Sequence, residues 1–185
     1  MTQTRPSELT LNGQTLTFRY EVIASDIRTV RLIVESTGFF HPPEVDVAVE
    51  LVEERLQRGA ASGYFFVFAE RDGQPIGYSC YGPIACTISS FDVYWVAVHR
   101  DAQQLGLGRR LMSLTEDLIR DHGGRRIYVE TSGQDKYLPT RCFYDRCGYI
   151  HAAELPEFYG VGDSKVIYLK VLTSGAQCDD SRGHP

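Results

Sequence analysis

The sequence has no surplus of positive charge. Its 185 residues include 19 lysines and arginines against 24 aspartates and glutamates, so the formal net charge is -5 at pH 7. Binding to the phosphate backbone of DNA or RNA depends on a basic face of the protein. The composition therefore argues against a nucleic-acid partner, and we expect none.

Long apolar runs and a Cys-x-x-Cys motif are also missing. No apolar segment approaches the roughly 20 residues that span a membrane, and residues 1–10 show no positively charged stretch followed by an apolar one. We therefore expect no membrane association and a cytoplasmic location. The five cysteines are odd in number and are not spaced as zinc ligands, so we predict reduced thiols and no metal site.

The chain is long enough to form one domain with one apolar core. We expect this domain to comprise residues 1–172, because residues 173–185 are small and polar and read as a disordered tail. Apolar residues recur with a period of two where strands are predicted and every three to four residues where helices are predicted. The predicted strands are residues 16–22, 64–69, 75–81, 91–98, 126–130, 149–153 and 165–171, and the predicted helices are residues 26–37, 44–57, 107–122 and 139–147.

A glycine turn links the strand predicted at residues 91–98 to the following helix. It contains the pattern Gln103-x-x-Gly106-x-Gly108. Glycines let the backbone approach a ligand closely, and the unpaired N–H groups at the start of a helix attract anions. Neither the Lys-Ser/Thr pair of a triphosphate loop nor the third glycine of the dinucleotide fingerprint is present, since Arg109 and Leu111 occupy those places. What remains suits a pyrophosphate.

Charge and strand alternation add two expectations around this turn. Three arginines near it would favour an external anion, because cations at a helix N-terminus oppose the helix dipole. If side chains alternate regularly along the preceding strand, every second residue from Asp92 onward lies on the same face of the sheet. The arginines are Arg100, Arg109 and Arg110, and the residues sharing that face are Asp92, Tyr94, Val96 and Val98.

The turn resembles the acetyl-CoA loop of the GCN5-related N-acetyltransferase (GNAT) family, Gln/Arg-x-x-Gly-x-Gly/Ala after a strand that ends in an apolar triplet. Residues 128–131 and 141–149 are similar to the family's second cofactor segment, and the resemblance covers roughly residues 65–171. It implies an α/β (α+β) GNAT fold, with a central, mixed, mostly antiparallel twisted sheet of about seven strands, flanked by helices and splayed at the acetyl-CoA site. The residues that it implies for binding acetyl-CoA are Val96, Ala97, Val98, Gln103, Gln104, Leu105, Gly106, Leu107, Gly108, Arg109 and Tyr137.

The same resemblance implies direct attack of an amine on acetyl-CoA within a ternary complex. Tyr144 stands at the position of the family's general acid, and a phenol with a pKa near 10 can protonate a thiolate. Glu130 and Asp92 each match a position that some members use for the base. Both stay candidates, and Glu130 is preferred because it lies in the same segment as Tyr144.

The acceptor site is expected at a loop with two aromatic residues. Phe39, Phe40 and His41 precede two prolines, and large apolar residues on loops often mark binding surfaces. Tyr159, in a later loop, is expected to border the same site. We expect a small-molecule or amino-acid-like primary amine as acceptor. Two alternatives stay open, a protein N-terminal or lysine acetyltransferase and a catalytically silent acetyl-CoA-binding module, and a homodimer is also open.

Overall fold

The computed structural model describes residues 8–11, 14–103 and 106–173. In this part of the chain eight strands form one sheet in the order β1-β2-β3-β4-β5-β6-β8-β7, and only β5 and β6 are parallel neighbours. A mixed, mostly antiparallel sheet was predicted, with about seven strands. The strands are β1 (Glu8–Leu11), β2 (Gln14–Arg19), β3 (Phe65–Arg71), β4 (Gln74–Pro83), β5 (Ser90–Val98), β6 (Arg126–Ser132), β7 (Ile150–Gly160) and β8 (Asp163–Val171).

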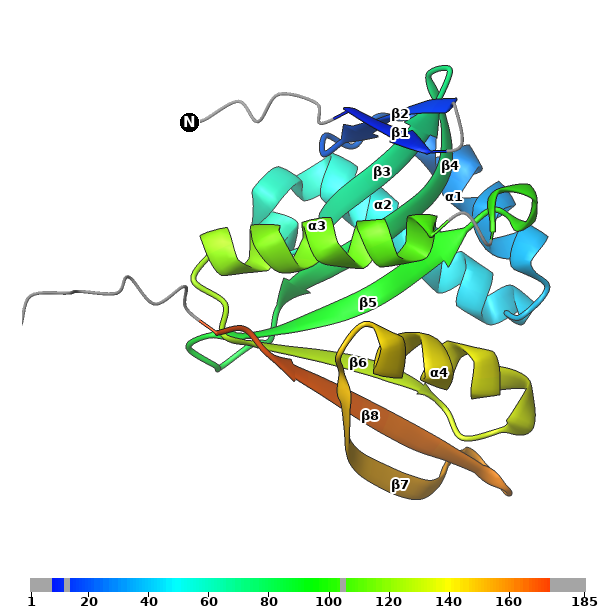
Figure 1. Ribbon diagram of the computed structural model, residues 1–185, viewed down its shortest axis with the longest axis vertical. Helices are drawn as coiled ribbons and strands as arrows, with labels where there is room; N and C mark the ends of the chain where they lie inside the picture. The colour runs from blue at the N-terminus through cyan, green and yellow to red at the C-terminus, as the bar shows by residue number, and fades with distance from the viewer. Residues whose placement is uncertain (1–7, 12–13, 104–105, 174–185) are drawn as a thin grey trace, which may run out of the picture.

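Four α-helices of the described residues cover both faces of the sheet (Figure 1). The pair α1 and α2 packs on one face and buries Val30 and Val52 against Phe66 and other strand residues. The pair α3 and α4 packs on the other face, where Leu111 is buried against Val67. None of these helices is long and apolar enough to cross a membrane. The helices are α1 (Asp26–Thr37), α2 (Pro42–Arg58), α3 (Leu107–Asp121) and α4 (Leu138–Arg146), with short 3-10 turns η1 (Gly59–Ser62), η2 (Arg100–Ala102) and η3 (Asp135–Tyr137).

The ends of two strands differ from the sequence prediction. Strand β2 ends at Arg19, although alternation suggested a strand to residue 22. Strand β7 continues to Gly160, where a loop was predicted after residue 153. All of its side chains are exposed, so this edge strand carries no buried face that periodicity could reveal. The proposed tail lies outside the described residues from position 174 onward.

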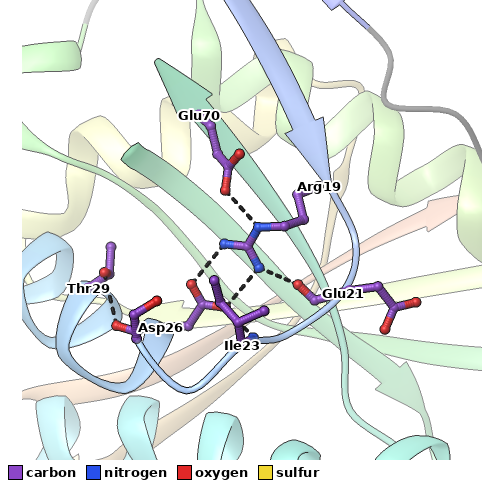
Figure 2. A network of polar contacts seen from close by, with 7 residues as sticks. Arg19, Glu21, Ile23, Asp26, Thr29 and Glu70 are labelled. Carbon is purple, nitrogen blue, oxygen red and sulfur yellow. Dashed lines mark hydrogen bonds and ion pairs between the residues drawn. The ribbon is translucent and has the colours of Figure 1, made fainter. Parts of the chain in front are cut away.

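A partly buried ion-pair network fixes the chain between β2 and α1 (Figure 2). Arg19 donates from its two terminal nitrogens to the two carboxylate oxygens of Asp26 at 2.9 and 2.8 Å, and from Nε to Glu70 at 2.6 Å. The backbone N–H of Ile23 donates to the same carboxylate at 2.8 Å. The guanidinium also lies 4.4 Å from the centre of the Phe68 ring. These contacts hold the start of α1 against β3 and lead the chain out of the sheet after Arg19.

Candidate active site

Strands β5 and β6 pair over only three residues. Ser90 to Asp92 lie opposite Arg126 to Tyr128, yet β5 continues to Val98 and β6 to Ser132. Beyond these pairs the two strands diverge, as Figure 1 shows between α3 and α4. The predicted splay of the sheet is therefore present. Along this edge of β5, the backbone groups after Asp92 are not used by a neighbouring strand and can meet a ligand.

A β-bulge at Tyr94 lies beside the point where the strands separate. Tyr81 of β4 pairs with Val93, whereas the preceding Cys80 pairs with Trp95, so Tyr94 has no opposite residue in β4. Bulges re-aim the side chains of a strand and are common next to active sites.

The bulge changes which side chains face which helices. Val93 and Val96 both pack in the core under α3, although regular alternation would place them on opposite faces. Asp92, which precedes Val93, consequently lies on the α1–α2 face, whereas Val96 and Val98 lie on the α3 face. The expectation that Asp92, Tyr94, Val96 and Val98 share one face was wrong, because it assumed unbroken alternation.

The glycine turn lies at the start of α3. Gly106 immediately precedes this helix with a φ of 75°, a left-handed conformation that favours glycine. A Cβ atom at Gly106 would meet no heavy atom within 4 Å, so there is room beside it. The N–H of Arg110 donates to the Gly106 carbonyl at 3.1 Å, which leaves the N–H groups of residues 107–109 without an acceptor inside the helix. This end of α3 therefore fits an anion such as a pyrophosphate.

Neighbouring contacts hold the turn close to β5 and α4. The Gln103 side chain donates from Nε2 to the Val98 carbonyl at 3.2 Å, which connects the turn to the end of β5. A Cβ atom at Gly108 would lie 3.4 Å from the ring of Phe143 in α4. Among the other expected cofactor residues, Val96 and Ala97 lie on the diverging part of β5, Leu107 is buried in α3, and Gln104 and Leu105 lie outside the described residues.

The three arginines near the turn do not converge on it. Arg109, in the first turn of α3, is exposed. Arg100 instead reaches the end of α1, where its guanidinium would lie 2.9 Å from a Cβ atom at Gly38. The guanidinium of Arg110 lies 5.7 Å from the centre of the Phe18 ring in β2. An external anion at the turn would therefore meet Arg109 in place of the expected cluster.

Tyr144 lies in α4 on the α3 side of the sheet. Its side chain is buried, and its ring centre lies 5.9 Å from that of Tyr149 and 5.6 Å from that of Tyr168. Burial, with a smaller contribution from Cys147, raises the pKa of Tyr144 well above its ordinary value near 10. The phenol therefore stays protonated throughout the neutral range, as a proton donor must.

A cavity of about 470 Å³ lies on the opposite face of the sheet. Asp92 of β5 and Glu130 of β6 both line it, together with Ala153 of β7 and Ile167 of β8. The two carboxylates that were predicted as alternative bases thus belong to one site. Tyr144 lies on the other face, so the sheet separates the proposed acid from both proposed bases.

The two carboxylates have different electrostatic surroundings. Burial, followed by the negative charge of Glu130, raises the pKa of Asp92 to about 6, and the positive charge of Lys165 opposes this rise. Glu130 itself is ion-paired with Lys165, whose Nζ lies 2.6 Å from its carboxylate. The same Nζ lies 3.8 Å from the centre of the Phe158 ring. Lys165 was not singled out from the sequence, because no local pattern shows that it lies beside Glu130.

The turn between α1 and α2 crosses the open end of the splay. The Phe40 ring packs on Trp95 of β5 with centres 5.3 Å apart, and the Phe39 ring packs on Tyr137 with centres 6.1 Å apart. The Tyr137 hydroxyl also donates to the Phe39 carbonyl at 3.4 Å. His41 is the residue that precedes α2. The turn therefore connects β5 with the segment that leads into α4.

Tyr159 lies near the cavity but is exposed. It belongs to β7, and Lys165 Nζ lies 5.9 Å from the centre of its ring. Partial burial and then the charge of Glu130 raise the pKa of Tyr159 to about 12. The structure thus brings Tyr159 close to Glu130 and Lys165, and the Phe39–Phe40 turn close to the gap.

The comparisons with known proteins agree with this geometry. A model of the acetyltransferase (GNAT) family matches residues 30–149, more than half of the chain. The chain belongs to the GNAT family. It is accordingly an acetyl-CoA-dependent acyltransferase with the GNAT fold.

Solved structures give the same result. A GNAT-family protein from Desulfovibrio desulfuricans is 49% identical, with 84% of this chain and 98% of that chain covered and a TM-score of 0.83. An aminoglycoside 6'-N-acetyltransferase complexed with coenzyme A is 18% identical, with 85% and 97% covered and a TM-score of 0.69. The ribosomal-protein-S18-alanine N-acetyltransferase from Escherichia coli is 14% identical, with 88% and 97% covered and a TM-score of 0.67. These last two share only the fold. A comparison with curated proteins found no match.

Proposed function

We propose that this GNAT enzyme transfers the acetyl group of acetyl-CoA to the primary amine of a small molecule, by direct attack in a ternary complex. The main support is that Asp92 lies where β5 and β6 separate, whereas Tyr144 lies on the opposite face of the sheet. The cavity beside Asp92 has about 470 Å³, which is within the range of small-molecule sites. Its two carboxylates would attract a cationic amine.

The start of α3 and the free edge of β5 would hold acetyl-CoA. The N–H groups of residues 107–109 and the Arg109 side chain would bind its pyrophosphate. Acetyl-CoA supplies the thioester carbonyl that the amine attacks and the thiolate that departs. Backbone N–H groups of β5 beyond Asp92 would stabilise negative charge that develops on the carbonyl oxygen.

Asp92 is the better candidate for the base. A carboxylate with a pKa of about 6 is mostly ionised at neutral pH and is more basic than an ordinary aspartate, so it can accept a proton from the amine. The carboxylate of Glu130 is already paired with Lys165. We assign Glu130 to raising the pKa of Asp92 through its charge, and Tyr144 to donating a proton to the thiolate.

Three substitutions test these roles. Asp92→Asn should lower kcat by about 10²-fold or more and remove the rise of kcat with pH near the Asp92 pKa. Glu130→Gln should keep that rise but move it to lower pH, because a negative charge near Asp92 is lost. Tyr144→Phe should lower kcat by about 10²-fold with little change in KM for acetyl-CoA. Tyr168→Phe removes a hydroxyl from the neighbouring ring and serves as the control, with kcat near that of the native protein.

The pH profiles also decide between the two bases. If Glu130→Gln abolished the pH-dependent rise and Asp92→Asn preserved it, Glu130 would be the base. If both variants kept the pH-dependent rise and a normal kcat, neither carboxylate would be the base, and water would accept the proton.

A substrate panel tests the class of acceptor. Free-thiol release from acetyl-CoA would be measured with small amines, with peptides bearing free N-termini and with lysine peptides. Turnover of small amines alone supports the proposal, and turnover of peptides alone would identify a protein acetyltransferase. Binding of acetyl-CoA without thiol release from any acceptor would indicate a silent binding module.

A further inference from the structure

An ion pair connects α3 with β8. Lys170 of β8 donates from Nζ to Oε2 of Glu116 in α3 at 2.7 Å. The side chains are only 25% and 11% exposed, and Glu116 lies on a helix whose other buried residues are mostly apolar. Because removing both charges from water is costly, such a pair adds little net stability. Its placement therefore needs another explanation.

The pair lies near the closed end of the splay. Lys170 is opposite Ile127 in β6, and Ile127 is opposite Phe91 in β5. Helix α3 packs against β3, β4 and β5, whereas β8 pairs with β6 and β7. The two halves of the sheet are joined by only three paired residues between β5 and β6. The contact between Glu116 and Lys170 also crosses this division, as a polar link beside the apolar contacts of the core.

Lys170 also holds the end of α4. Its Nζ donates a second hydrogen bond, 2.7 Å long, to the carbonyl of Cys147, the residue that follows α4. The same Nζ lies 5.3 Å from the centre of the Tyr149 ring. Cys147 and Tyr149 both donate their backbone N–H to the carbonyl of Tyr144 at 3.0 Å. Lys170 therefore contacts two residues, Cys147 and Tyr149, that are each hydrogen-bonded to the backbone of Tyr144.

We propose that Glu116 and Lys170 are positioning residues that hold Tyr144 in its place through the C-terminal turn of α4. This role rests on the proposed function of Tyr144 as the proton donor. Glu116 orients the ammonium group so that another of its N–H bonds reaches the Cys147 carbonyl. A displacement of about 1 Å in a catalytic group can cost about 10²-fold in rate, so a small shift of this turn would be visible in kcat.

The test replaces both charged residues with apolar ones of similar size, so that no unpaired charge is left buried. The double variant Glu116→Met with Lys170→Met keeps apolar cover, and such replacements are often neutral for stability. Its kcat should fall about tenfold or more while KM for acetyl-CoA changes less than about threefold. Lys170→Arg keeps a charged donor and should retain most of kcat. Asp117→Asn is the matched control, since it removes an exposed 2.7 Å ion pair with Arg120 from the same helix, and its kcat should be unchanged.

Combining the double Met variant with Tyr144→Phe tests whether Glu116 and Lys170 affect kcat through Tyr144. If Glu116 and Lys170 act through Tyr144, the triple variant should lose no more kcat than Tyr144→Phe alone. Normal kcat in the double Met variant, with an impaired Tyr144→Phe, would overturn the positioning role and leave the proposed function intact. Normal kcat in Tyr144→Phe would overturn the proton donor itself. Multiplied losses in the triple variant would overturn the route from Lys170 to Tyr144.

Discussion

The contact between Arg19 and Asp26 leads to a prediction for Asp26→Asn. The amide has nearly the same shape as the carboxylate, so packing is kept while the charge is lost. The native carboxylate is 1% exposed, and it accepts two bonds from Arg19, at 2.8 and 2.9 Å, and one from Ile23. Removing one member of a buried ion pair costs about 3–5 kcal/mol. Because Arg19 is 20% exposed and keeps Glu70, we expect a loss of about 3 kcal/mol, at the lower end of that range.

Urea denaturation measures this loss. With an m-value of about 2 kcal/mol/M, a loss of about 3 kcal/mol lowers the midpoint by about 1.5 M. Asp46→Asn is the control, because Asp46 bonds Arg31 at the same 2.8 Å while the two side chains are 59% and 42% exposed. Exposed pairs contribute about 0.2–1 kcal/mol, so this midpoint should fall by about 0.5 M or less. Equal shifts in both variants would refute the reasoning that burial, and not bond length, sets the contribution.

Three further predictions concern the active site. Gly106→Asp should weaken coenzyme A binding, measured by calorimetry, at least about tenfold more than Gly106→Asn. Both residues tolerate the left-handed conformation, but only aspartate repels a pyrophosphate. Equal affinities of the two variants would contradict binding at this turn. The kcat of the native protein should rise roughly tenfold between pH 5 and 7, since Asp92, with a pKa of about 6, must lose its proton before it can accept one; a kcat that is independent of pH would exclude Asp92 as the base. Phe40→Ala removes the ring that packs on Trp95 and should change the ratio of kcat/KM values among small amines; unchanged selectivity with lower thermal stability would show that Phe40 only fills the core.

The sequence predicted those elements whose burial leaves a periodic trace. Leu107, Leu111 and Leu114 of α3 are buried, as their helical spacing indicated. The edge strand β7 has no buried side, so its second half was taken for a loop. The bulge at Tyr94 also escaped prediction, because no residue type marks it in the sequence. Only the pairing of β5 with β4 reveals it.

From the sequence, residue types and positions could be proposed for the candidate site, but not the charges that surround each carboxylate. Asp92 and Glu130 were both proposed from the sequence, and the structure brings them to one cavity. The choice between them depends on Lys165, which reaches Glu130 only because β6 and β8 are neighbours in the sheet. An ion pair between distant parts of the chain has no local signal, so the base could not be chosen from sequence.

The division of the sheet at β5 and β6 also affects how two substrates could enter the site. The glycine turn opens on the side of α3, whereas the cavity with Asp92 opens on the side of α1 and α2. A molecule seated at one of these openings leaves the other uncovered. If coenzyme A binds at the turn and the amine in the cavity, as we propose, the two would enter from opposite faces of the sheet, and either could bind first.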